Sequence, residues 1–287
     1  MACIDARGLR KAYGKTLALA GIDLQVEDGR ILGLIGPNGA GKSTALQAIL
    51  GLIPYEGELK VLGLDPWGER DKLMAQVCFV ADVAVLPRWL KVRDAVDYVA
   101  GVHPRFDRAK AEAFLAKTTI KPASTVRQLS KGMVAQLHLA LVMAIDAQLL
   151  VLDEPTLGLD IVYRKSFYDS LLNDYFDQSR TIVVSTHQVE EIQHILTDVA
   201  FIDRGRIVLN TSMEAFEARY AELMVGPDRL DAALALKPIQ ARQVFGRHIL
   251  LFDGVERARL AELGEVRAPS LADLFVAVMG PAQGASA

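Results

Sequence analysis

The stretch Gly36-Pro37-Asn38-Gly39-Ala40-Gly41-Lys42-Ser43-Thr44 decides the fold of this chain. It matches the pattern of a phosphate-binding loop, and its surroundings suit that function. The apolar run 31–35 before it is typical of a strand buried on both faces of a parallel sheet. A helical pattern begins at Ser43, and we expect this helix to end near Pro54.

Each part of the loop has a physical role in holding phosphate. Its glycines let backbone amides turn toward phosphate oxygens, and the following helix directs the positive end of its dipole at them. We expect Lys42 to reach the β- and γ-phosphates and the Ser43 hydroxyl to ligate Mg²⁺. The stretch therefore predicts a site for a nucleoside triphosphate and Mg²⁺.

A second apolar run, residues 149–152, ends in the acidic pair Asp153-Glu154. In a phosphate-loop protein, such a strand end holds Mg²⁺ and activates water. We expect Asp153 to act on the metal through a bound water and Glu154 to orient or deprotonate the attacking water. Alone, an acidic turn after a strand would be a weak signal, but the loop at 36–44 strengthens it.

A third motif, Leu129-Ser130-Lys131-Gly132-Met133, precedes a helical apolar pattern for which Ser130 is a good N-cap. It lies 23 residues before Asp153, counted from Ser130. With these motifs in this order, the chain resembles the nucleotide-binding subunit of an ATP-binding cassette (ABC) transporter, whose signature reads Leu-Ser-Gly-Gly-Gln.

The resemblance implies roles for further residues. Tyr13 falls where the family stacks an aromatic ring on adenine, Asp160 falls in the D-loop 158–160, and His187 falls at the switch histidine that contacts the γ-phosphate. It also implies that two subunits, identical or different, enclose two ATP molecules. Ser130, Lys131 and Gly132 would then bind the ATP held by the other subunit.

Three positions depart from the family pattern. Lys131 replaces the first signature glycine, and Met133 replaces the glutamine. We expect the Lys131 cation to strengthen ATP-dependent closure. Asp82 stands where the family usually has glutamine; its oxygens suit Mg²⁺, but an ionised carboxylate cannot donate a hydrogen bond. Asp82 is therefore a candidate metal residue, and the usual coupling of this segment to a membrane partner is in question.

Composition limits the function classes. The 287 residues are 51% hydrophobic and 23% charged, with a net charge of -3, which argues against a general nucleic-acid binder. Cys3 and Cys78 have no disulfide or metal spacing, and no apolar run is long enough to span a membrane. With this composition, the resemblance implies a cytoplasmic chain, peripheral on the inner face of the cell membrane, with a separate membrane permease subunit as partner.

The predicted fold class is α/β, a P-loop NTPase of ABC ATPase type with an antiparallel β subdomain, a helical subdomain and a small C-terminal α/β extension. The ATPase domain is expected at 1–212, with its helical subdomain at about 83–130, and the extension at 213–287. Within the extension we expect a helix over 213–224, a strand over 248–252 and a helix from Ser270.

The leading interpretation is an ATP-hydrolysing subunit that powers a permease. Export is favoured by the signature variant and by the C-terminal tail, which resembles the extension of ABC subunits that work with separate exporter-type permeases. Two alternatives stay open. One is a soluble ABC-type ATPase that works on DNA or ribosomes, which the single cassette and the acidic balance disfavour. The other is a regulatory module that binds ATP without turning it over, which the presence of both Glu154 and His187 disfavours.

Overall fold

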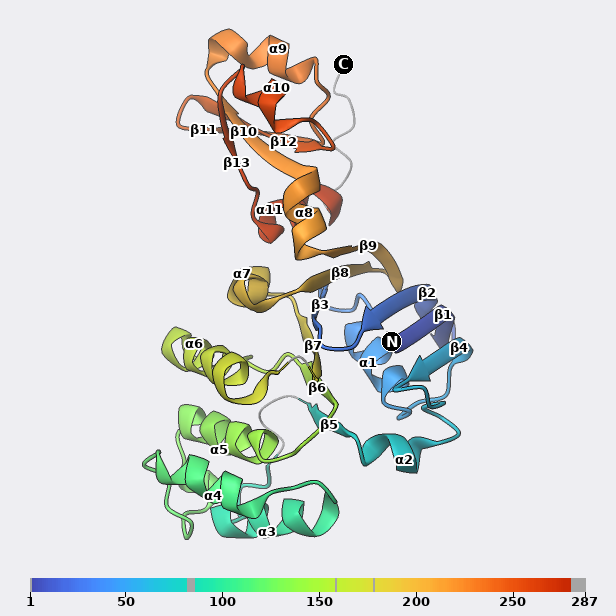
Figure 1. Cartoon of the computed structure of the whole chain (residues 1–287), viewed down its shortest axis with the longest axis vertical. Helices are drawn as coiled ribbons and strands as arrows, with labels where there is room; N and C mark the ends of the chain where they lie inside the picture. Colours follow the sequence, from blue (N-terminus) through green and yellow to red (C-terminus); the bar gives the residue numbers. More distant parts are fainter. Residues whose placement is uncertain (1, 82–85, 158, 178, 280–287) are drawn as a thin grey trace. The chain divides into compact units, whose positions relative to one another are not determined.

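The computed structural model describes residues 2–81, 86–157, 159–177 and 179–279, and the chain divides into two compact units (Figure 1). Unit 1 comprises Met1–Leu196 and Ala200–Leu209. Unit 2 comprises Thr197–Val199 and Asn210–Ala287. The predicted phosphate loop and acidic strand both belong to unit 1.

A six-stranded sheet forms the centre of unit 1. Its order is β5 (Val77–Val80), β6 (Leu149–Asp153), β7 (Thr181–Thr186), β3 (Ile31–Ile35), β8 (Asp198–Asp203) and β9 (Arg206–Ser212). Strands β5, β6, β7 and β3 pair in parallel, and every residue of β3 and β7 is buried. This burial explains their continuous apolar sequence, and the parallel sheet confirms the predicted α/β class.

An antiparallel sheet of three strands lies beside it in the order β2 (Thr16–Glu27), β1 (Ala2–Tyr13) and β4 (Glu56–Val61). Strands β1 and β2 are each 12 residues long. Their pairing contains several register shifts, and Gly8 in β1 and Gly21 in β2 both have positive φ. Such bulges bend a long strand without ending it.

Helix α1 (Lys42–Ile49) follows the phosphate loop and ends earlier than the sequence predicted. The expected end near Pro54 is wrong because Gly51 adopts a left-handed conformation, with φ of 62°. The Leu52 amide then donates to the Gln47 carbonyl at 2.8 Å, which closes a Schellman cap. The glycine therefore terminates this helix before the proline is reached.

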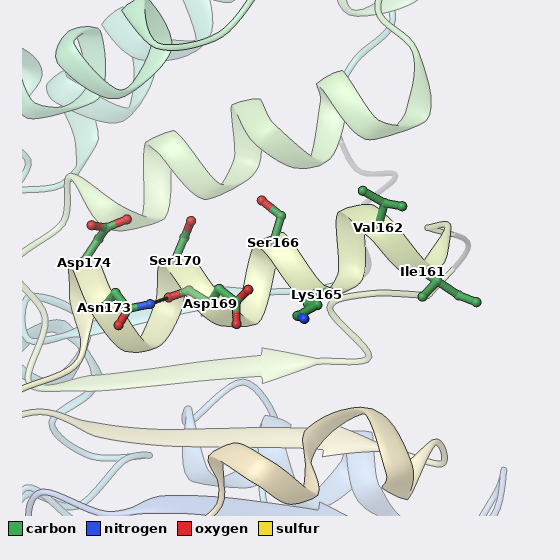
Figure 2. Close-up of a pocket in the computed structure, with 8 residues that line it drawn as sticks. All are labelled: Ile161, Val162, Lys165, Ser166, Asp169, Ser170, Asn173 and Asp174. Carbon is green, nitrogen blue, oxygen red and sulfur yellow. Dashed lines mark hydrogen bonds between the residues drawn. The ribbon is translucent and has the colours of Figure 1, made fainter.

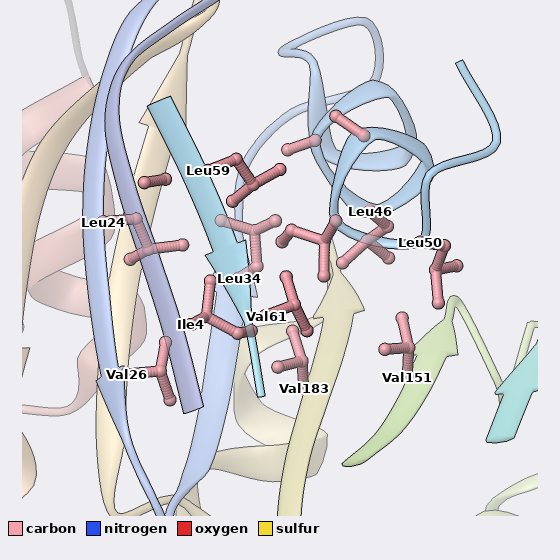
Figure 3. Close-up of a cluster of buried hydrophobic side chains, with 14 of the residues drawn as sticks. Ile4, Leu24, Val26, Leu34, Leu46, Leu50, Leu59, Val61, Val151 and Val183 are labelled. Carbon is pink, nitrogen blue, oxygen red and sulfur yellow. The ribbon is translucent and has the colours of Figure 1, made fainter. Parts of the chain in front are cut away.

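The main hydrophobic core lies between α1, the antiparallel sheet and one face of the central sheet (Figure 3). Leu24 and Val61 enter it from the antiparallel sheet, Leu46 from α1, and Val151 and Val183 from the central strands. All are at most 4% exposed. This packing holds α1 firmly against the sheet and so fixes the loop that precedes it.

Helices α5 (Lys131–Met143) and α6 (Ile161–Ser170) lie on the opposite face of the central sheet from α1 (Figure 1). A second core packs α3 (Val92–Val102), α4 (Arg108–Ala116) and α5 together. The remaining short elements of unit 1 are α2 (Arg70–Met74), η1 (Val126–Gln128), the π-helical turn η2 (Leu171–Tyr175), α7 (Val189–Ile192) and η3 (Gln193–Ile195).

Unit 2 contains an antiparallel sheet in the order β11 (Gln240–Val244), β12 (Arg247–Asp253), β10 (Tyr220–Val225) and β13 (Glu265–Arg267). Its helices are α8 (Met213–Arg219), η4 (Pro227–Arg229), α9 (Leu230–Leu234), α10 (Arg257–Ala261) and α11 (Leu271–Met279). A core of its own includes Leu223 and Phe252 from the sheet and Leu260 from α10.

One prediction for this unit is wrong and two are confirmed. The helix expected over 213–224 ends at Arg219, and the next residues form β10, a central strand paired on both sides. A short apolar run does not separate a buried strand from a buried helix, and sheet pairing decides here. Strand β12 and helix α11 occur where expected, and Ser270 Oγ accepts from the Asp273 amide at 3.0 Å.

Candidate functional site

The phosphate-loop stretch connects the end of β3 to the start of α1 and is held from both sides by other strands. The Gly36 amide donates to the carbonyl of Thr186, at the end of β7, over 3.3 Å. A Cβ atom on Gly36 would lie 2.3 Å from the Ile202 carbonyl oxygen. Gly41 has φ of 108°, and its added Cβ would lie 2.6 Å from the Ala18 carbonyl oxygen. Packing thus requires glycine at both positions.

The other loop residues differ in exposure. Pro37, Asn38, Gly39 and Ser43 are exposed, Thr44 is half-buried and Ala40 is buried. Helix α1 places the first amides of its positive end at this loop. The exposed segment therefore presents main-chain N–H groups and a serine hydroxyl, which are groups that bind phosphate and a hard cation.

Lys42 lies at the first position of α1 and is only 6% exposed. Its Nζ donates to the Gly36 carbonyl oxygen at 2.8 Å and lies 3.2 Å from Glu154 Oε1. The buried ammonium is therefore compensated by a carboxylate and by the loop's own main chain. This contact joins the phosphate loop to the acidic end of β6.

Glu154 follows β6 in a strained left-handed conformation, with φ of 48°. Its amide donates to the Ser185 carbonyl oxygen at 3.1 Å, which fixes its main chain against β7. His187 Nδ1 lies 3.1 Å from both Oε1 and Oε2 of Glu154. One carboxylate thus contacts both the Lys42 ammonium and the His187 imidazole.

Asp153 accepts a hydrogen bond from the Ser185 hydroxyl through Oδ1. Sequence reasoning did not assign Ser185 a role. The signal was available, because β6 and β7 are parallel neighbours and Asp153 pairs with Ser185 in register. Side chains at the ends of two adjacent parallel strands meet at one edge of the sheet. Ser185 therefore orients the carboxylate that was predicted to act on the metal.

The oxygen donors near the loop suit Mg²⁺. Among the residues that the structure describes, no group of three or more His, Cys, Asp or Glu could hold a metal ion. Mg²⁺ does not require such a protein cage, because it is commonly held by one or two protein oxygens together with substrate phosphates and water. The Ser43 hydroxyl and the Asp153 carboxylate are donors of that kind.

The predicted signature residues lie at the start of α5. Ser130 is the N-cap, and its Oγ accepts from the Met133 amide at 3.2 Å. Lys131 is exposed, whereas Gly132 is buried against α6. A Cβ atom on Gly132 would lie 2.5 Å from the Tyr163 ring. The glycine is thus required by packing within the chain.

Asp160 and Tyr13 lie on other elements. Asp160 caps α6, and its Oδ1 accepts from the amides of Val162 and Tyr163 at 3.1 Å each. Tyr13 ends β1 with 48% of its surface exposed, and the Lys11 ammonium lies 5.2 Å from its ring centroid. An exposed ring of this kind can stack on a planar ligand.

The outer face of α6 borders a shallow pocket (Figure 2). Ile161 and Val162, directly after Asp160, are 81% and 75% exposed. Lys165 and Asp169 continue this face along the helix. The first turn of α6 therefore exposes two apolar side chains.

Two predicted positions lie outside the described residues. These are Asp82, the candidate metal residue, and Gly158 of the predicted D-loop. In the described part of the chain, the structure brings Lys42, Glu154 and His187 together with the Asp153–Ser185 pair. Such a set can bind phosphate, hold a cation and accept a proton from water.

Comparison with known proteins identifies the family of this chain. The profile of the family described as ABC transporter matches residues 19–157. The chain is 30% identical to "Daunorubicin resistance ATP-binding protein DrrA3" of Streptomyces coeruleorubidus, over 96% of each chain. It is also 30% identical to "Nod factor export ATP-binding protein I" of Rhizobium sp. (strain N33), over 96% of this chain and 97% of the relative.

Solved structures show the same fold. One, titled "Structure of ATP binding subunit of ABC transporter", gives a TM-score of 0.65 at 22% identity, covering 75% of this chain and 92% of the other. A nucleotide-free ATP-binding cassette from an ABC transporter gives 0.64 at 17% identity, covering 74% and 92%. Within the described residues, no helix is long and apolar enough to cross a membrane.

Proposed function

The chain belongs to the family of ABC transporter ATP-binding proteins, whose members hydrolyse ATP, and we propose that it powers a separate membrane permease for export. The observation that carries the proposed ATP hydrolysis is the cluster of Lys42, Glu154 and His187, which lies where the phosphate loop meets the end of β6. Export is supported by two relatives whose names refer to drug resistance and to Nod factor export, aligned over nearly the whole chain.

The chain's own residues supply positioning and proton transfer. Loop amides and Lys42 bind the phosphates, which requires the Lys42 ammonium to exchange some of its present main-chain contacts for phosphate oxygens. The Glu154 carboxylate, thereby released from Lys42, accepts the proton of the attacking water. His187 contacts the same carboxylate now and would hydrogen-bond the γ-phosphate when ATP is present.

Mg²⁺ would be held by Ser43 and Asp153 and would supply charge neutralisation at the phosphates. Ser185 keeps the Asp153 carboxylate in orientation for that role. Asp82 is proposed as a further oxygen donor on its residue type alone. Tyr13 would stack on the adenine ring, for which its exposure leaves room.

A second ABC subunit is proposed to complete each site. The first amides of α5 and the exposed Lys131 would face the partner's ATP, with Ser130 at the helix end. Exposed Ile161 and Val162, next to Asp160, would be covered in such a dimer. Largely exposed apolar side chains beside a predicted interface loop support this arrangement.

We propose that the permease contacts the helical part of unit 1. The chain would then lie in the cytoplasm, on the inner face of the membrane. Trp89 is 76% exposed and borders a pocket that also includes Arg88 and Arg127. Interface hot spots are rich in tryptophan and arginine, and this exposed tryptophan lies beside two arginines.

We further propose that residues 213–287 form an extension separate from the ATPase domain 1–212. The helical subdomain of the ATPase domain is proposed at about 83–130.

The test is a pull-down of tagged Glu154→Gln chain from detergent-solubilised native membranes, with ATP and Mg²⁺, followed by mass spectrometry. We expect a polytopic membrane protein in fixed ratio to the tagged chain. The matched control is the same chain with Trp89→Ala added, which should recover much less of that protein while retaining ATP binding.

Other recoveries would contradict the proposal in distinct ways. Only soluble partners, such as ribosomal proteins or DNA-bound proteins, would favour a soluble ABC-type ATPase without a transport role. Recovery of the chain alone, with no ATP turnover in the unsubstituted protein, would favour a regulatory ATP-binding module.

A further inference from the structure

An ion pair outside the Lys42–Glu154–His187 cluster joins helix α6 to helix α7. In the chain, α6 follows Glu154 and α7 follows His187. Arg164 of α6 contacts Glu191 of α7 through Nη1 and Oε1. Their side chains are 23% and 20% exposed. Removing one member of a mostly buried pair leaves the other charge uncompensated, so the two residues hold α6 and α7 together.

Arg164 reaches beyond Glu191 to the main chain and to a neighbour of the site. Its Nε donates to the Leu159 carbonyl oxygen at 2.6 Å, and its Nη1 donates to Gln188 Oε1 at 3.0 Å. Leu159 directly precedes Asp160, and Gln188 directly follows His187. One guanidinium therefore contacts both the turn before α6 and the residue next to the histidine.

Glu191 makes the matching contact on the other side. Its Oε2 accepts from Thr156 Oγ1 at 3.2 Å, and Thr156 lies two residues after Glu154. The Tyr168 hydroxyl lies 3.3 Å from the same Oγ1, and burial raises the pKa of Tyr168, which keeps its proton available. The segment after Glu154 and the segment after His187 are thus tied twice, once through each member of the ion pair.

We propose that Arg164 is a positioning residue that sets where the His187 ring stands relative to the Glu154 carboxylate, and that it links this position to the turn bearing Asp160. The proposal rests on the proposed roles of His187 and Glu154 in hydrolysis. It has a structural consequence of its own, because a shift of the 159–160 turn would be transmitted through the guanidinium to Gln188 and so to His187.

The chemistry requires arginine at this position. The three acceptors, which are a main-chain carbonyl, an amide oxygen and a carboxylate, are contacted by two nitrogens, Nε and Nη1, of one guanidinium. A planar guanidinium offers five N–H donors in a fixed fork, whereas an ammonium is a point charge on a flexible stem. Arg164→Lys keeps the charge and most of the volume but loses this fixed set of contacts.

The experiment reads the histidine directly. The full chain is labelled with ¹⁵N-histidine, and the imidazole resonances of its five histidines are recorded without nucleotide. The His187 signal is assigned by its loss in His187→Gln. We expect Arg164→Lys and, separately, Glu191→Gln to shift the His187 Nδ1 signal, while the His103 and His248 signals stay in place.

Arg180→Lys is the matched control. Arg180 is also mostly buried, at 17% side-chain exposure, and it also contacts a main-chain carbonyl, that of Tyr175 at 2.7 Å, and a carboxylate, that of Asp146 at 3.1 Å. Its replacement removes comparable contacts away from the histidine. It should lower the melting temperature without moving the His187 signal, which separates positioning from loss of stability.

Turnover provides the second readout. Arg164→Lys should lower kcat on the order of tenfold, and at most about 100-fold, as small misplacement of reacting groups does. The Kd for MgATP should stay within about twofold, because the residue does not contact the phosphate loop. The Arg164→Lys/Glu191→Gln double variant should lose little more than either single variant, since the two residues act as one unit.

An unmoved His187 signal in both folded single variants would overturn the proposal, whatever happens to turnover. A shifted signal with unchanged kcat would equally overturn the positioning role in hydrolysis. If the unsubstituted chain showed no ATP turnover at all, the proposed function would fail, and the nucleotide-free spectra would still report whether Arg164 positions His187.

Discussion

The Lys42 ammonium lies 3.2 Å from the Glu154 carboxylate, so the buried cation of the phosphate loop is paired with the carboxylate proposed to act as base. Lys42 is 6% exposed, and an unpaired charge would be costly there. ATP brings phosphate oxygens that compete for the same ammonium. Binding of the substrate and release of the base are therefore linked through one lysine.

The first prediction concerns Glu154→Gln. This variant should keep ATP affinity but lose turnover by about 10²–10⁴-fold, the usual contribution of a general base. Phosphate release and the Kd for MgATP are the measurements. Glu190→Gln, the same chemical change at an exposed position on α7, should retain parental turnover. Parental turnover in Glu154→Gln would remove this residue from its role.

The second prediction concerns Gly132. Gly132→Ala should lower the free energy of unfolding by about 1–3 kcal/mol, the range for overpacking, because the new methyl group would lie 2.5 Å from the Tyr163 ring. Chemical unfolding measures this. Combining it with Tyr163→Leu should recover part of the loss. Additive losses in the double variant would show that the ring is not the obstacle.

The third prediction concerns Phe245, which is fully exposed in the turn between β11 and β12. Phe245 and Gly246 both have positive φ, at 48° and 77°, a pattern that favours Asn-Gly. Phe245→Asn should therefore stabilise the chain by about 1 kcal/mol, the cost of left-handed backbone for an ordinary residue. A lower melting temperature in this variant would contradict the prediction.

The fourth prediction concerns Lys131, exposed at the first position of α5. In the Glu154→Gln background with ATP, Lys131→Gly should raise the dimer dissociation constant about two- to fivefold, the effect of a partly exposed charge. Light scattering across protein concentrations measures it, and high salt should remove the difference. Lys237→Gly, the same change at a left-handed turn position, is the control. Tighter dimers in Lys131→Gly would show that the cation opposes closure.

The fifth prediction concerns pH. Burial raises the pKa of the Cys78 thiol from 9.0 to about 12. The unfolded chain loses this proton first, so the stability from the buried neutral thiol is complete below pH 9.0 and is lost as the pH rises toward 12. The free energy of unfolding, measured with urea from pH 8 to 10.5, should fall more steeply above pH 9.0 in the parent than in Cys78→Ala, by about 1.4 kcal/mol per pH unit. Parallel slopes would contradict it.

Much of unit 1 could be predicted from sequence because its signals are local. A phosphate-loop stretch between strand and helix, and an apolar strand ending in two carboxylates, each carry their structural context in adjacent residues. The wrong end of α1 came from reading Pro54 as the stop when Gly51 acts first. Local chemistry was sufficient there, but the nearer signal was overlooked.

Other features depend on contacts that sequence does not display. The run 220–225 contains good helix formers, yet it forms β10 because strands pair with it on both sides. The pair Arg164 and Glu191 is separated by 27 residues, and neither lies in a recognisable motif. Such an ion pair can be identified only from a structure, in which the two helices lie side by side.

The burial of both native thiols has a practical consequence. Cys3 and Cys78 are buried in the fold, and desolvation raises the pKa of Cys3 to about 11 as well. A thiol that is neither accessible nor ionised resists maleimide reagents. The chain is therefore suited to site-specific fluorescent or spin labelling, because a single cysteine introduced at exposed Phe245 would carry the label.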